Sequence, residues 1–179
     1  MMKKKTFTAA SLALALLAAP LSPTFAATPA SADTAAAAFN VDKASFVKQV
    51  SSSNRFEIES SKLAEEKARD ADVKEFARQM IADHTKAGEG LKTAAKLDDA
   101  APALSPKHSA MIETLKGASE QDFQPLYIEM QTVAHMEAVT LFATYAKGGD
   151  DAAVKAFAAE TLPKLEMHKA HVMKLVAAH

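Results

Sequence analysis

The chain has 179 residues, of which 49% are hydrophobic and 24% are charged, and its formal net charge is -1 at pH 7. This composition is typical of one folded domain with a sizeable core, and it shows no basic face for nucleic acid. The chain contains no cysteine, which excludes disulfides, thiolate nucleophiles and thiolate metal ligands.

The N-terminus has the pattern of a secretory signal peptide, which we assign to residues 1–26. Three lysines at positions 3–5 precede an apolar run over residues 7–19 that is too short to span a bilayer. The small-x-small sequence that ends at Ala26 predicts cleavage after that residue. We therefore expect a periplasmic or secreted protein with no transmembrane segment after processing. The alternative is an uncleaved N-terminal anchor helix.

Residues 27–40 are rich in Ala, Thr, Ser and Pro and have no periodic apolar face, so we expect a disordered lead-in. Residues 41–179 are expected to form one helical-bundle domain. They contain four long segments in which apolar residues recur every three or four positions, which is the period of an α-helix. Acidic N-cap residues predict where these helices begin: Asp42, Asp70 or Asp72, Asp122, and Asp150 or Asp151.

A shorter helix is predicted in the long connection between the second and third segments. Ser105 is its expected N-cap, Pro106 its first residue and Gly117 its end. His108 on this helix is expected to be an exposed polar residue. The pattern as a whole predicts an all-α domain, built from two helical hairpins that are joined by the long connection.

Each long segment carries one titratable residue on or beside its apolar stripe: Glu57, His84, His135 and His168. At 1.5 Å per residue, the first two lie about 20 Å from the turn of the first hairpin, and the other two lie about 22–27 Å from the turn of the second. Helices of this length span about 40 Å, so all four groups fall near mid-height. They could therefore meet at one point in the core.

A carboxylate and three imidazoles are costly to bury unless they pair or bind a metal, and together they offer a complete ligand set for zinc, copper or iron. Asp83 and Glu137 lie beside histidines in the sequence and could orient them from outside the ligand set. Met80 precedes His84 by one turn and could act as a soft ligand for Cu(I), although methionine in a core is usually filler. The alternative is a metal-free polar core in which Glu57 is ionised and one histidine is charged.

No catalytic arrangement stands out in the sequence. It has no Glu-x-x-His, which di-iron carboxylate sites use, and no Ser-His-Asp pattern or phosphate loop. Whether the protein is an enzyme stays open, because a metal-dependent oxidase or peroxidase would need an open coordination position beside a cavity. The sequence identifies no protein partner, and it is compatible with a homo-oligomer.

Five short sequences are distinctive in combination. They are FEIE at 56–59, MIADHTKA at 80–87, the Asp-Phe-x-x-x-Tyr run at 122–127, His135 followed by Leu141-Phe142, and TLP at 161–163 with His168. Together they resemble a bacterial exported family, the domain of unknown function 4142, over about residues 46–176. The resemblance implies a ferritin-like four-helix bundle, export from the cytoplasm and no settled activity. It places the family's polar residues at Glu57, Asp83, His84, His135 and His168, whereas Ala134 stands where members often have an acidic residue.

These observations lead us to expect a periplasmic, ferritin-like helical bundle that binds a transition metal in its core. The expected role in envelope stress or metal handling rests on the resemblance. The rival interpretation is a metal-free structural or interaction bundle with a hydrogen-bonded polar core.

Overall fold

The computed structural model describes residues 41–98 and 103–179. The expected signal peptide and the lead-in over residues 27–40 lie outside this part of the chain. Within the described ranges every regular element is an α-helix: α2 (Lys43–Lys67), α3 (Ala71–Ala95), α4 (Pro106–Gly117), α5 (Glu120–Gly148) and α6 (Ala152–Ala178). None of these helices is long and apolar enough to cross a membrane.

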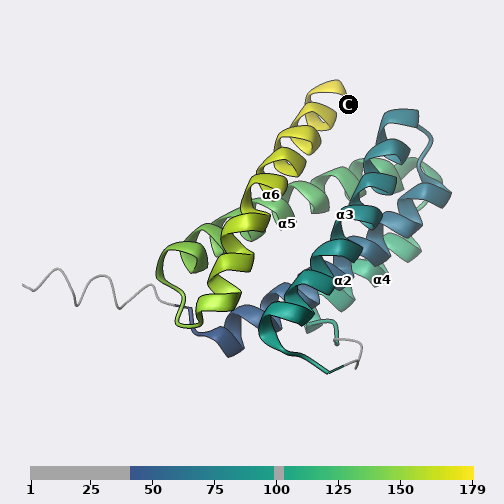
Figure 1. Cartoon of the computed structure of the whole chain (residues 1–179). Helices are drawn as coiled ribbons and strands as arrows, with labels where there is room; N and C mark the ends of the chain where they lie inside the picture. The colour runs from purple at the N-terminus through teal and green to yellow at the C-terminus, as the bar shows by residue number, and fades with distance from the viewer. Residues whose placement is uncertain (1–40, 99–102) are drawn as a thin grey trace, which may run out of the picture. The chain divides into compact units, whose positions relative to one another are not determined.

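The four long helices pack as two hairpins, α2 with α3 and α5 with α6 (Figure 1). The hairpins meet where α3 packs against α6 and α2 packs against α5. Contacts of Ser61 with Tyr127 and of Phe46 with Tyr145 show that α2 and α5 are antiparallel. Since α2 is also antiparallel to α3, helices α3 and α5 run in the same direction, and the chain between them must return along the bundle.

Helix α4 lies in this return connection and packs against α2 and α5. Its start is attached to α2, because the hydroxyl of Ser52 accepts a hydrogen bond from the backbone N–H of Ser105 at 2.7 Å. The structure therefore confirms the predicted all-α domain of two hairpins with a short helix in the long connection.

Side-chain capping explains where the helices begin. Each N-cap side chain accepts a hydrogen bond from the first turn of its helix, and the five N-cap residues are Asp42, Asp70, Ser105, Ser119 and Asp151. Four of these starts agree with the predictions, but α5 begins earlier than the expected cap at Asp122. Ser119 is the cap, and Asp122 instead accepts a hydrogen bond from the Ser119 hydroxyl at 2.6 Å.

The apolar core contains two large clusters along the bundle, besides a small one around Phe56 and Ile112. One contains Phe76, Met80 and Tyr127, and the other contains Leu91, Phe142 and Leu165. Buried polar residues lie between the clusters on each of the four long helices, and they include Glu57, His84, His135 and His168. Close packing on both sides of this polar layer holds the four helices at a fixed separation.

Candidate metal centre

Three histidines from three different helices meet in the polar layer. His84 lies on α3, His135 on α5 and His168 on α6, and their exposed fractions are only 6%, 1% and 1%. The ring centroids lie 5.8 Å apart for His84 and His135, 5.6 Å for His84 and His168, and 5.5 Å for His135 and His168. Each histidine offers one ligand atom, and these atoms all lie within 4.8 Å of one another. Of the four groups that were expected to meet in the core, the three histidines therefore do so.

One nitrogen of each ring is already held by a neighbouring oxygen. Nδ1 of His84 donates to Oδ1 of Asn54 at 3.0 Å, and Nδ1 of His135 donates to the backbone carbonyl of Gln131 at 2.9 Å. Nε2 of His168 donates to Oδ2 of Asp83 at 2.8 Å. Because each partner is a carbonyl or carboxylate oxygen, each of these ring nitrogens must carry the proton.

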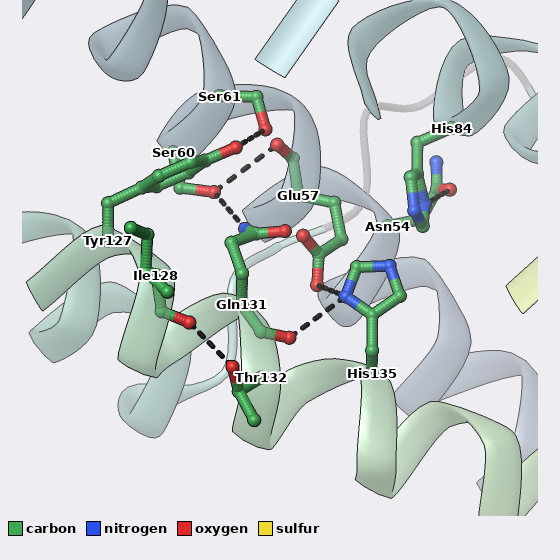
Figure 2. Close-up of polar contacts among 10 residues, drawn as sticks. All are labelled: Asn54, Glu57, Ser60, Ser61, His84, Tyr127, Ile128, Gln131, Thr132 and His135. Carbon is green, nitrogen blue, oxygen red and sulfur yellow. Dashed lines mark hydrogen bonds and ion pairs between the residues drawn. The ribbon is translucent and has the colours of Figure 1, made fainter. Parts of the chain in front are cut away.

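The remaining nitrogen of each ring is buried and accepts no hydrogen bond from the described residues. These atoms are Nε2 of His84, Nε2 of His135 and Nδ1 of His168. In a neutral ring each has a free lone pair, and leaving such a buried acceptor unsatisfied costs about 1–3 kcal/mol. Figure 2 shows the free nitrogen of His135 pointing toward His84. The site thus combines three lone pairs with no donor to satisfy them.

Burial keeps the three rings in the neutral form. Burial lowers the pKa of His84 well below its usual 6.5, and the nearby His135 and His168 lower it further. Burial likewise lowers the pKa of His135 to about 4, although its hydrogen bond to the Gln131 carbonyl partly opposes this. Burial lowers the pKa of His168 too, and its bond to Asp83 offsets only part of the shift. Neutral imidazole is the form that binds metal ions.

The structure places Glu57 beside this group rather than within it. Its Oε1 lies 3.9 Å from Nδ1 of His135, the nitrogen on the opposite side of that ring from the free one (Figure 2). Burial raises the pKa of Glu57 to about 8, and a hydrogen bond from Gln131 only partly counters this. Glu57 is therefore a neutral acid at pH 7 in the metal-free protein. The group of three histidines leaves it out.

Asp83, Glu137 and Met80, the other expected site residues, have different surroundings. Asp83 holds the ring of His168 across the helix interface, not that of its sequence neighbour His84. Burial raises the pKa of Asp83, but the hydrogen bond from His168 and the positive charge of Lys164 outweigh it, so the net shift is downward.

Glu137 points away from the core, because two residues correspond to about 200° around a helix. It is 56% exposed and forms an ion pair with Lys107 at 2.6 Å instead of orienting His135. Met80 is fully buried in the apolar cluster with Phe76 and Tyr127.

Two features of the site were not predicted. Asn54, which orients His84, lies three residues before Glu57 on the same stripe of α2. This helical spacing is the sequence signal that could have identified Asn54 as a residue of the site. His108 was expected to be exposed, and this was wrong. It is half-buried because α4 packs on α2, where its Nδ1 lies 2.7 Å from the Ser52 hydroxyl and its ring stacks on Phe56 at 5.1 Å.

Comparison with protein families gives one match. Residues 28–175 match the family described as domain of unknown function (DUF4142). The chain belongs to this family. The match confirms the resemblance found in the short sequences around the core histidines. No curated protein and no solved structure matches the chain. The DUF4142 description assigns no activity. The three-histidine group is therefore the main structural indication of function.

The buried groups predict how the stability of the metal-free protein depends on pH. Below the ordinary histidine pKa of 6.5, the unfolded chain takes up more protons than the three buried histidines of the folded protein, because their pKa values are lowered, so the free energy of unfolding falls as the pH falls. Above pH 4.5, the unfolded chain loses the Glu57 proton that the folded protein keeps until about pH 8, so this group lowers stability as the pH rises. Three histidines outweigh one glutamate below pH 6.5, and we expect maximal stability near that pH.

Urea unfolding of the metal-free protein from about pH 5 to about pH 8 measures this profile. Glu57→Gln should remove the decline above the maximum, and relative to the unaltered protein its stability should rise by about 2 kcal/mol between about pH 6.5 and about pH 8. The net decline of the unaltered protein is smaller than this, because the histidines of the unfolded chain still lose protons in that interval. Glu129→Gln, on the exposed face of α5, is the matched control and should retain the decline. A decline that persists unchanged in Glu57→Gln would show that Glu57 is ionised in the folded protein.

Proposed function

We propose that this protein binds one transition-metal ion in its core through His84, His135 and His168. The observation that supports this most directly is the arrangement of ring nitrogens. Each ring donates its single N–H away from the centre and leaves one buried nitrogen free. One ion would satisfy all three free nitrogens at once.

The ligand set favours particular metals. Three neutral imidazoles suit zinc, copper or iron, whereas calcium and magnesium prefer oxygen ligands. At a metal–nitrogen distance of about 2.1 Å, the nitrogens of a tetrahedral site lie about 3.4 Å apart. Ligand atoms within 4.8 Å of one another therefore need only modest side-chain movement to reach this geometry. The three hydrogen-bonded oxygens would orient the rings, as outer partners of metal-bound histidines usually do.

A metal-free polar core is the competing interpretation. In that core the three rings would have to satisfy one another by hydrogen bonds. None of them has an N–H left to donate inward, because all three donate to Asn54, Gln131 and Asp83. A closed metal-free network would therefore need a buried water molecule or an added proton. Burial, which lowers all three pKa values, opposes the added proton.

We further propose that the protein acts outside the cytoplasm, in the periplasm or after secretion, in metal handling or in the response to envelope stress. The N-terminal pattern of three lysines, a short apolar run and a small-x-small site supports export. The long crossover connection between α3 and α5 is a feature that ferritin-like bundles share. A buried site made of three neutral ligands is suited to retaining an ion. This proposal gives no side chain a catalytic role.

Metal titration tests the proposed site. The metal-free protein should bind one equivalent of Zn²⁺, with an increase in melting temperature. Alanine at position 84, 135 or 168 removes one ligand and should weaken Zn²⁺ affinity by at least about 100-fold, and Asn54→Ala should weaken it by about 10- to 100-fold because the ring of His84 loses its partner. Isothermal titration calorimetry with elemental analysis gives both affinity and stoichiometry.

The matched control is His171→Ala. His171 lies on the same helix as His168, but its ring packs on Phe76 at 5.0 Å and is not part of the group. This variant should bind Zn²⁺ like the unaltered protein. Absence of Zn²⁺ binding, or an equal loss in His171→Ala and His168→Ala, would refute the site and favour the metal-free core.

Export can be tested by the mass of the protein recovered from the periplasm of a Gram-negative host. The expected product begins at Ala27, because cleavage follows the small residue at position 26. Ala26→Lys replaces that small residue and should leave the precursor uncleaved. Recovery of the full-length chain from the cytoplasm, with the unaltered sequence, would contradict the proposed location.

A further inference from the structure

A pocket of about 830 Å³ adjoins the three-histidine group. Where it meets the core it is lined by one residue from each long helix: Asn54, Ala87, Ala138 and Leu165. The last three each lie three residues, or about one turn, from the core histidine of the same helix. His84 itself also lines the pocket. The pocket therefore reaches His84 and lies about one helical turn from His135 and His168.

The pocket has a largely apolar interior with charged groups at its edge. Its apolar lining includes Val50, Leu141 and Phe142, and also Leu104 of the segment before α4. The exposed lysines at 48 and 107 belong to the same lining. Two small side chains, Ala87 and Ala138, leave space at the end next to the histidines. The volume lies within the range of about 300–1,000 Å³ that is typical of small-molecule sites.

Three histidine ligands leave the fourth position of a tetrahedral ion open. Helix α2, the fourth member of the bundle, contributes no atom to the group, because Glu57 lies against the far side of the His135 ring. One turn along the same helix, Asn54 faces the pocket and holds His84. A ligand in the pocket would thus lie directly beside His84, one of the three proposed ligands of the ion.

We propose that the pocket binds a small molecule with an apolar body and one neutral nitrogen or sulfur donor, which completes the coordination of the ion. This inference rests on the proposed metal site. The apolar lining selects the body of the ligand, and the imidazole ligands select a metal that accepts nitrogen or sulfur. The role of Ala87 and Ala138 is to keep the approach to the ion free of side chains.

Cobalt-loaded protein allows metal and ligand to be followed separately, because the visible absorption of bound Co²⁺ responds to a change in its ligands. The probe is 4-phenylimidazole, which has an apolar ring and a nitrogen donor, and imidazole is the comparison without the ring. 4-Phenylimidazole should change the spectrum and bind about tenfold more tightly than imidazole, because its phenyl ring becomes buried.

Ala138→Leu fills the end of the pocket and should weaken 4-phenylimidazole binding by about tenfold while Co²⁺ affinity is retained. Ala82→Leu makes the same change on the exposed face of α3 and should alter neither affinity.

The outcomes separate the two proposals. If Co²⁺ binds but 4-phenylimidazole leaves its spectrum unchanged, the pocket ligand is refuted and the metal site stands. Equal binding of the probe to Ala138→Leu and to the unaltered protein would also refute the pocket ligand. If Co²⁺ does not bind at all, the metal site is refuted, and the pocket ligand is refuted with it.

Discussion

A neutral histidine has one N–H to donate, and each of the three core histidines donates it away from the centre of the bundle. The acceptors are the side-chain oxygens of Asn54 and Asp83 and the backbone carbonyl of Gln131. These three hydrogen bonds leave three lone pairs in the interior with no donor. The proposed metal binding follows from this constraint, because a cation is the simplest occupant that would satisfy three converging acceptors.

The rest of the fold keeps this arrangement rigid. Apolar clusters pack on both sides of the polar layer, and capped helices set the height at which each histidine lies. The connection between α3 and α5 also shapes the surroundings of the site. Its helix α4 is attached to α2 at Ser52 and forms part of the wall of the adjoining pocket. The same connection that joins the parallel helices α3 and α5 therefore also shapes access to the core.

Much of the architecture could be predicted because it depends on local signals. Helical periodicity located the long helices, acidic N-caps located the starts of α2, α3 and α6, and Ser105 with Pro106 located α4. Counting residues from the turns was enough to bring His84, His135 and His168 to one height. Height along a helix is simple to derive, since it depends only on a constant rise per residue.

The directions of the side chains could not be predicted in the same way. Whether Glu57 faces the three rings depends on helix rotation and on its rotamer, and in the structure its carboxyl group lies on the Nδ1 side of His135, beside Gln131. Asp83 was expected near its sequence neighbour but contacts His168 on another helix, because only the packed interface of α3 and α6 brings the two together. The burial of His108 likewise depends on how α4 docks, which no local pattern specifies.

The protonation of the three rings tests the central claim most directly. Nitrogen-15 NMR of the metal-free protein near neutral pH should show Nδ1–H on His84 and His135 and Nε2–H on His168. On addition of Zn²⁺, the signals of the other three nitrogens should shift, while those of His171 and His179 stay in place. The opposite tautomers, charged rings, or a Zn²⁺ response at the protonated nitrogens would contradict the claim that three lone pairs converge in the core.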